Sequence, residues 1–238
     1  MRALILNSGT GSRMGKLTLD MPKCLLEIAG DVTVLSNQLD IIKQCGIREV
    51  ILTTGPFEEK IQAYLGKRYN DLQITCVSNP SYKTTNYIYS MYLAREYLNE
   101  EILLLHGDLI FKHDTCDMLL KSEYENAVTV EKTDSLPDKD FKARLDSFGV
   151  QEIGIDVFGQ QCVSLLPFYR LSKSGMAIWL EEIESFIENG NVSVYAENAF
   201  NKRAEEIKLQ PVYLEEQLCM EIDTPADLEK AKREYEKD

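Results

Sequence analysis

Short apolar segments alternate with segments of helical periodicity through the first half of the chain. Four nearly continuous apolar runs have the length of buried strands, and the segments between them have helical spacing. Apolar strands separated by helices are typical of a parallel sheet that is covered on both faces. The pattern therefore predicts strands at 3–6, 49–55, 73–79 and 101–108 and helices at 34–46, 58–69 and 87–98.

The pattern changes after residue 127, where apolar and polar positions alternate more openly. The short segments follow one another closely, which predicts a small antiparallel β extension. The last segment places a strand end before a helix with Thr224 as N-cap and Pro225 at its first position. No repeat or linker divides the chain, so we expect a single domain over 1–238. The expected elements are strands at 127–132, 141–146, 150–156, 162–171 and 208–214, and helices at 174–189 and 198–206.

Composition and charge argue against several classes of protein. The 238 residues are 44% hydrophobic, and 26 Lys and Arg against 39 Asp and Glu give a net charge of −13. Such an acidic surface argues against nucleic acid or an anionic membrane as a partner. No apolar stretch approaches the roughly 18 residues that span a bilayer, and no signal-peptide pattern is present, so a cytoplasmic location is expected.

The cysteines and histidines narrow the chemistry further. Six cysteines lie far apart, and only two histidines are present. We expect reduced, mostly buried thiols of a cytosolic protein, and neither a zinc site nor a Ser-His-Asp triad.

A glycine-rich segment, LNSGTGSRMGKLTLDMPKCLLEI at 6–28, follows the first strand. It should therefore lie at the carboxyl end of the sheet, where open α/β folds bind ligands. Met14 breaks the dinucleotide fingerprint, and Thr10 and Leu17 break the Walker A pattern.

The residue types of this segment nevertheless suit a triphosphate. Its glycines expose backbone N–H groups, and Arg13, Lys16 and Lys23 bring positive charge to the same place. The alternative is an ordinary solvent-exposed loop with incidental basic residues.

Carboxylates at two strand ends predict a magnesium site. Asp108 ends the most apolar strand, Asp223 ends a later segment, and strand alternation puts Glu221 on the same side as Asp223. Mg²⁺ commonly takes one or two carboxylates together with substrate phosphates. We expect Asp108 and Asp223 as the main ligands and Glu221 as a third. The alternatives are a turn residue at Asp108 and an acid that favours the helix N-terminus at Asp223.

The sequence resembles a family of nucleotidyltransferases that activate sugar phosphates and alcohol phosphates. The glycine-rich loop with Arg and the following Pro-Lys pair are similar to the family signature. NPSYKTTNYIYSMYLA (79–94), LLLHGDLIF (103–111) and EIDTPADL (221–228) resemble the branch of the CTP:phosphocholine and 2-aminoethylphosphonate cytidylyltransferases. The resemblance implies a GT-A-like fold, with a mixed, mainly parallel Rossmann-like sheet. It also implies a nucleotide- and metal-binding core at 1–126 and 208–238 and an acceptor-binding portion at 127–207.

The resemblance also implies roles for individual residues. Arg13 and Lys23 would neutralise the triphosphate. Residues that would contact the nucleotide or hold its loop are Leu6, Asn7, Ser8, Gly9, Gly11, Ser12, Lys16, Asn79, Thr84, Thr85, Asn86 and Ser90. Tyr87, Tyr89 and Met91 are expected to pack within their helix. Many relatives have two alanines in place of Asn7 and Ser8, and wider relatives have an acidic residue in place of His106.

A cationic acceptor would be bound well by aromatic faces and carboxylates. The candidates for the acceptor site are Lys83, Tyr169, Arg170, Tyr195 and Glu197, whereas Trp179 has the helical spacing of a packing residue. The resemblance implies transfer of CMP from CTP to a small phosphorylated or phosphonate alcohol, with Mg²⁺ as cofactor. The acceptor oxygen is already anionic near pH 7 and needs no general base. A homodimer is compatible with the sequence, which does not decide the oligomeric state.

Other functions remain open at this point. One is a sugar-1-phosphate nucleotidyltransferase that uses UTP or dTTP. Another is a nucleotide-sugar glycosyltransferase, although the usual DxD motif is missing. A third is a non-catalytic module that binds a nucleotide, against which Arg13, Lys23, Asp108 and Asp223 argue.

Overall fold

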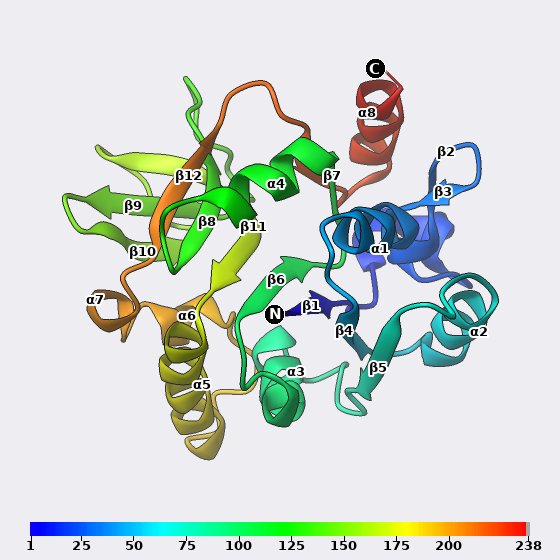
Figure 1. The fold of residues 1–238 in the computed structure, drawn as a ribbon, viewed down its shortest axis with the longest axis horizontal. Helices are drawn as coiled ribbons and strands as arrows, with labels where there is room; N and C mark the ends of the chain where they lie inside the picture. The colour runs from blue at the N-terminus through cyan, green and yellow to red at the C-terminus, as the bar shows by residue number, and fades with distance from the viewer. Residues whose placement is uncertain (237–238) are drawn as a thin grey trace.

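The computed structural model describes residues 1–236 and contains a nine-stranded mixed sheet. Its central strands β1, β4, β5 and β6 are parallel to one another, and β1 lies between β4 and β6. These strands are coloured blue to green in Figure 1. Their bounds are β1 (Arg2–Leu6), β4 (Glu49–Thr54), β5 (Gln73–Ser78) and β6 (Ile102–His106).

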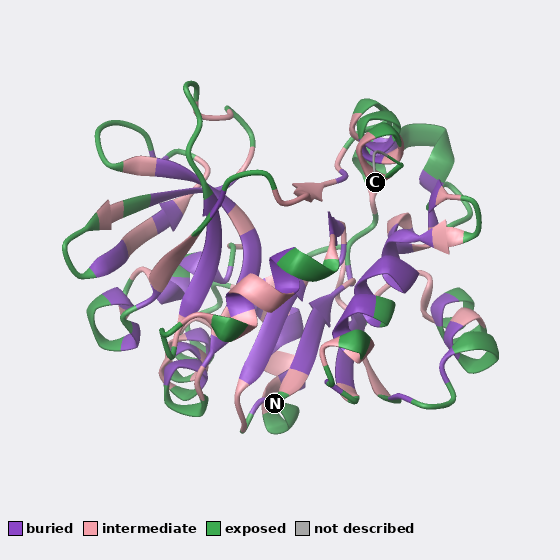
Figure 2. Ribbon diagram, turned by 45° about the horizontal axis from the view of Figure 1, so that its top comes forward, coloured by how far each residue is buried: buried purple, intermediate pink, exposed green. Residues whose placement is uncertain are grey.

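The alternation of side chains along β1 explains why the sheet has helices on both faces. Leu4 packs in one buried cluster with residues of α3 and α5, and Ile5 packs in the other with residues of α1, α2 and α4. Figure 2 shows the central strands buried between helices whose outer sides are exposed. The helices are α1 (Val34–Gln44), α2 (Glu58–Arg68), α3 (Tyr87–Ala94), α4 (His113–Lys121), α5 (Lys173–Glu188), α6 (Glu197–Phe200), α7 (Ala204–Ile207) and α8 (Pro225–Tyr235).

The predicted antiparallel extension is attached through one long strand, β11 (Cys162–Leu171). Its last residues pair antiparallel with β6, and its first residues pair with β9. The extension lies beside the parallel strands in Figure 1. The predicted fold class is confirmed. The strands of the extension are β8 (Ala127–Glu131), β9 (Lys142–Asp146), β10 (Gly149–Gly154) and β12 (Gln210–Leu214).

Several element boundaries differ from the predictions. The strand predicted at 101–108 ends at His106, and a turn at Gly107 and Asp108 leads into β7 (Leu109–Phe111). β7 leaves the main sheet and pairs with β13 (Cys219–Glu221). The turn forms because side chains of α1 bind its backbone: Gln38 Nε2 donates to the carbonyls of His106 at 2.9 Å and Leu109 at 2.7 Å.

Other differences lie where the periodicity is short. The helix predicted at 87–98 ends at Ala94 and continues as a 3-10 turn, and the segment 198–206 forms the two short helices α6 and α7. The strand predicted at 208–214 forms β12, which pairs parallel with β8. The helix α4 and the small hairpin of β2 (Glu27–Ala29) and β3 (Val32–Thr33) were not predicted.

None of the helices within residues 1–236 is both long enough and apolar enough to cross a lipid bilayer. All six cysteines are free thiols.

Candidate active site

A cavity of about 340 Å³ opens at the carboxyl ends of β1 and β6. Loops that follow separate strands meet there, as expected for a parallel sheet. A second cavity of about 940 Å³ is larger and shares Asp140, Glu221 and Asp223 with the first, but the glycine-rich loop does not line it. Predicted site residues that line the smaller cavity are Leu6, Asn7, Ser8, Gly9, Gly11, Ser12, Arg13, Lys23, Asn79, Thr85, Asn86, Asp108, Tyr195, Glu221 and Asp223.

The glycine-rich loop is anchored by Met14. Its side chain is 1% exposed and packs in a buried cluster with Leu228 and Ala231 of α8. The loop turns at Gly11, whose φ of 65° favours glycine, and the Gly11 carbonyl accepts a 2.8 Å hydrogen bond from Thr18 Oγ1. Position 14 is part of the core, which explains why it holds methionine where the dinucleotide fingerprint has glycine.

Lys23 joins three distant segments of the chain. Its Nζ donates to Asp108 Oδ2 and, at 3.1 Å, to Asp223 Oδ1, which also pairs with Arg13 Nη2 at 2.9 Å. Burial, the largest influence, lowers the pKa of Lys23, but the two carboxylates outweigh burial and raise the pKa above its ordinary value. Burial raises the pKa of Asp108, and Lys23 more than reverses this, so that the pKa is lowered. Lys23 and Asp108 are therefore both charged at neutral pH.

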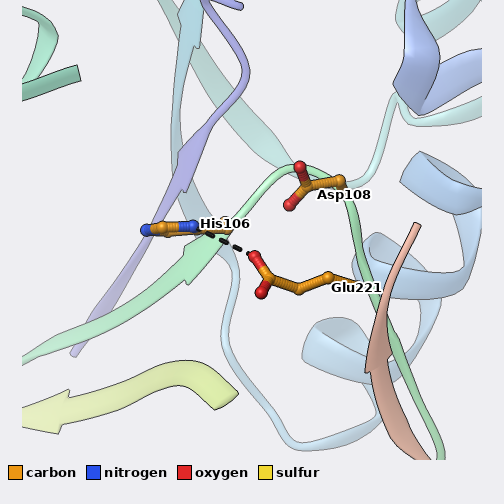
Figure 3. Close-up of side chains that lie close together, drawn as sticks. All are labelled: His106, Asp108 and Glu221. Atoms are coloured by element: carbon orange, nitrogen blue, oxygen red, sulfur yellow. Dashed lines mark ion pairs between the residues drawn. The ribbon is translucent and has the colours of Figure 1, made fainter. Parts of the chain in front are cut away.

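A second group of side chains lies next to this centre. His106, Asp108 and Glu221 point toward one another in Figure 3, and His106 Nδ1 lies 3.5 Å from Glu221 Oε1. Burial, reinforced by Asp108 and Asp223, raises the pKa of Glu221 to about 7 against the opposing effect of His106. Among the described residues, the buried oxygen Asp108 Oδ1 has no hydrogen-bond partner. These carboxylates fit a hard divalent cation such as Mg²⁺.

A hydroxyl and amide network supports the other wall of the cavity. Ser8 Oγ lies 2.7 Å from Ser90 Oγ, and Asn79 Nδ2 donates to Ser90 Oγ and to Thr85 Oγ1, each at 3.0 Å. Ser90 is buried and lies behind the wall. The hydroxyl of Ser8, where many relatives have alanine, therefore links the glycine-rich loop to α3. Asn86 caps α3 by accepting a 2.7 Å hydrogen bond from the Tyr87 backbone N–H.

Seven predicted site residues do not line the cavity: Ser90, Tyr169 and Glu197 lie behind its walls, and the other four lie elsewhere. Lys16 and Lys83 are exposed, and the Thr84 side chain donates to the Ser81 carbonyl at 3.3 Å. Arg170 lies near the opposite end of β6, where its guanidinium pairs with Glu101 at 2.8 Å. The expectation for Arg170 fails because β11 runs antiparallel to β6, so that each residue toward the end of β11 lies further from the site.

An aromatic cluster forms the remaining wall and was not predicted as such. The Tyr87 ring lies 4.8 Å from His106 and 5.8 Å from Tyr195, and the Tyr195 ring lies 5.1 Å from Phe141. All four side chains line the cavity. Tyr87, expected to pack in its helix, therefore also faces the site. The helical position of Tyr87 was visible in the sequence, but its partners come from distant segments.

A buried carboxylate lies behind this aromatic cluster. Glu197 is 1% exposed and accepts hydrogen bonds from Tyr87 Oη and, at 3.0 Å, from Tyr169 Oη. Burial, followed by the charge of Glu197, raises the pKa of both tyrosines well above their ordinary value, so both stay protonated donors. Within residues 1–236, neither lysine nor arginine forms an ion pair with Glu197.

The turn at Gly107 should not tolerate a side chain. A Cβ there would lie 2.7 Å from the Leu6 carbonyl oxygen and closer still to Asn7 Oδ1. We expect Gly107→Ala to lower the free energy of unfolding by about 1–3 kcal/mol, as overpacking does. Urea denaturation measures this change.

Gly66→Ala is the matched control. Gly66 lies in α2, and a Cβ there would meet nothing within 4 Å. This variant should gain up to about 1 kcal/mol, because alanine has the higher helix propensity. A stability of Gly107→Ala equal to that of the wild type would contradict the close contact.

A mainly parallel sheet with a glycine-rich loop, a partly buried lysine and carboxylates at one cavity is the arrangement expected of an enzyme that transfers nucleotidyl groups. Residues 3–231 match the family described as the MobA-like NTP transferase domain, and the chain belongs to this family. It is a nucleotidyltransferase. The resemblance seen in the sequence is confirmed.

Similar proteins extend this finding. The choline-phosphate cytidylyltransferase of Streptococcus pneumoniae is 26% identical over 235 residues, which cover 97% of this chain and 96% of that protein. The CMP-5'-(3-aminopropyl)phosphonate synthase of Streptomyces rubellomurinus is 33% identical over 132 residues, which are 56% of this chain but 21% of that protein. A solved structure of the CTP:phosphocholine cytidylyltransferase from Streptococcus pneumoniae has a TM-score of 0.80 at 21% identity and covers 98% of this chain and 97% of that one.

Proposed function

We propose that the chain is a cytidylyltransferase that transfers CMP from CTP to a small phosphate or phosphonate with a cationic head group. The observation that carries this proposal is the aromatic cluster with the buried charge of Glu197 behind it, beside the centre at Lys23. The names of the similar proteins support CTP as donor and a phosphocholine- or aminoalkylphosphonate-type acceptor.

The nucleotide belongs with the glycine-rich loop and the network at Asn79. Backbone N–H groups of the loop and the charge of Arg13 and Lys23 suit the triphosphate. Asn7 Nδ2 is buried without a hydrogen-bond partner within residues 1–236, so it is a donor available to the nucleotide. We assign 1–126 and 208–238 to the nucleotide and metal, and 127–207, together with Tyr87 of α3, to the acceptor.

The reaction requires positioning and charge neutralisation. An anionic oxygen of the acceptor attacks the α-phosphorus in line, a new P–O bond forms, and pyrophosphate leaves with the electrons of the broken P–O bond. Lys23 neutralises charge that develops on the phosphates and holds Asp108 and Asp223 at a fixed separation. A divalent cation held at Asp108, Glu221 and the neighbouring Asp223, the predicted magnesium ligands, would supply further charge neutralisation.

The acceptor head group belongs against the aromatic cluster. An ammonium or trimethylammonium group at the faces of Tyr87, Phe141 and Tyr195 gains cation–π attraction, which is worth about 2 kcal/mol when desolvated. Glu197 adds an opposite charge in a buried, poorly screened position. Tyr169 donates to Glu197 behind the wall, so it supports the site without contacting the acceptor.

Pyrophosphate release tests the proposal. CTP, UTP, dTTP and ATP are crossed with phosphocholine, 2-aminoethylphosphonate, 2-hydroxyethylphosphonate and glucose-1-phosphate in the presence of Mg²⁺. We expect turnover with CTP, and a higher kcat/KM for the two acceptors with a cationic head group than for 2-hydroxyethylphosphonate. In Glu197→Gln, KM for 2-aminoethylphosphonate should rise about tenfold, equivalent to about 1.4 kcal/mol. KM for 2-hydroxyethylphosphonate, whose head group is uncharged, should not change.

Glu188→Gln, at the exposed end of α5, is the matched control and should leave both KM values unchanged. Turnover with a sugar phosphate alone would move the function to sugar-phosphate activation. Nucleotide binding without turnover of any acceptor would indicate a non-catalytic module. If KM rose equally for both phosphonates in Glu197→Gln, Glu197 would support the fold and would not attract the cationic head group.

A further inference from the structure

His106 brings a nitrogen ligand into a site otherwise made of carboxylates. One ligand atom from each of His106, Asp108 and Glu221 lies within 4.8 Å of the others. His106 ends β6, Asp108 lies in the turn that follows, and Glu221 ends β13, so all three approach one space (Figure 3).

The backbone that carries these ligands is held firmly. Gln38 binds the carbonyls on both sides of the turn, and Asn37 Nδ2 donates to the Phe111 carbonyl at 3.0 Å. β13 is fixed to β7 by antiparallel pairing that aligns Glu221 with Leu109. The three side chains are therefore positioned before any ion binds, which favours affinity because less order must be imposed on binding.

The hydrogen bonds of Asp108 leave one oxygen for a metal. Lys23 occupies Oδ2, and the buried Oδ1 has no partner within the part of the chain that the structure describes. His106 contacts Glu221 at 3.5 Å, which exceeds the length of a good hydrogen bond. The contact between His106 and Glu221 therefore leaves hydrogen-bonding capacity on both side chains. A cation bound by Asp108 and Glu221 would provide a partner for both carboxylates.

We propose that His106, Asp108 and Glu221 bind a divalent first-row transition ion of the Mn²⁺ class, with a ring nitrogen of His106 as ligand. Mg²⁺ is bound almost wholly through oxygen, whereas imidazole suits transition ions. The site therefore prefers Mn²⁺ to Mg²⁺. This inference rests on the proposed function only in treating the cavity as the active site, because the metal site itself requires neither CTP nor acceptor.

Electron spin-echo spectroscopy of Mn²⁺ tests the nitrogen ligand directly. Chelator-treated, tag-free protein is titrated with Mn²⁺ at neutral pH without nucleotide, and bound Mn²⁺ is examined for coupling to ¹⁴N. We expect one bound Mn²⁺ with ¹⁴N coupling in the wild type. His106→Asn should lose the coupling, bind Mn²⁺ at least about tenfold more weakly and lose most of the preference over Mg²⁺.

The second histidine provides the matched control. His113 is exposed at the start of α4, and His113→Asn should retain both the affinity and the coupling. The chain has two histidines, so His106 is the sole histidine of the His113→Asn variant. Labelling this variant with ¹⁵N-histidine should convert the ¹⁴N coupling of the bound Mn²⁺ to ¹⁵N coupling. This measurement keeps His106 in place and so does not depend on the folding of His106→Asn.

Three results would overturn the inference. The first is that the wild type binds no Mn²⁺ at millimolar concentration. The second is that bound Mn²⁺ shows no nitrogen coupling in the wild type. The third is that the coupling remains that of ¹⁴N in the ¹⁵N-histidine sample. Pyrophosphate release with CTP would remain possible in each case, so failure of the metal site and failure of the proposed function are distinguishable.

Discussion

Replacing Lys23 with methionine should lower kcat by about 10²–10³-fold, the effect of removing one preorganised donor from a developing charge. Methionine retains the apolar stem but not the ammonium group that contacts Asp108 and Asp223. Loss of that charge also removes the ion-pair partner of Asp108 and leaves Asp223 paired only with Arg13 among the described residues. Steady-state kinetics with CTP and the preferred acceptor measure the change, and titration without acceptor measures CTP affinity.

Lys67→Met is the matched control, because Lys67 is exposed on α2 and far from the cavity. It should leave kcat and KM unchanged. If Lys23→Met raises KM for CTP and leaves kcat intact, Lys23 binds the ground state and the transition state equally, and its proposed role in the chemical step is wrong.

Trp179→Ala should lower the free energy of unfolding by about 3–5 kcal/mol, the usual cost of truncating a buried tryptophan. Trp179 is completely buried, and its ring lies 5.7 Å from Tyr169 and 5.6 Å from Phe200. Its Nε1 donates to the Ala196 carbonyl at 2.9 Å, so alanine removes both the packing and the hydrogen bond. Urea denaturation followed by far-ultraviolet circular dichroism measures the loss.

Trp179→Phe separates these two contributions. It keeps most of the buried apolar surface but cannot donate to the carbonyl next to Glu197. We expect a smaller loss of stability than for alanine, together with a higher KM for the cationic acceptor because Glu197 is held less firmly. A loss below about 1 kcal/mol in Trp179→Ala would contradict the central packing role of this side chain.

The arrangement of the sheet could be predicted from the sequence because side-chain alternation and apolar runs are local properties. The position of the glycine-rich loop at the carboxyl ends of the strands follows from that arrangement. The turn at Gly107 could not be predicted, since it depends on Gln38 and Asn37, which lie far away in the chain. Helix α4 was missed for a different reason: its nine residues are amphipathic, but its buried face carries Thr115 and Cys116 beside Leu119, so few strongly apolar residues mark it.

The site was predictable where its residues lie in short motifs at the ends of predicted strands. Arg13, Lys23, Asp108 and Asp223 meet as the resemblance implied. The aromatic cluster was not predictable, because its members come from distant segments and each resembles a core residue when considered alone. Arg170 was misplaced for a related reason: its residue type suits a phosphate, but the direction of β11 decides its position.

The ten-residue strand β11 has a consequence for how substrates are enclosed. Its backbone runs without a break from the parallel strands into the extension, so the two parts share hydrogen bonds instead of a flexible connection. Domain closure about a hinge would have to break these bonds. Enclosure of the substrates should therefore come from movements of the glycine-rich loop and neighbouring loops over a rigid base.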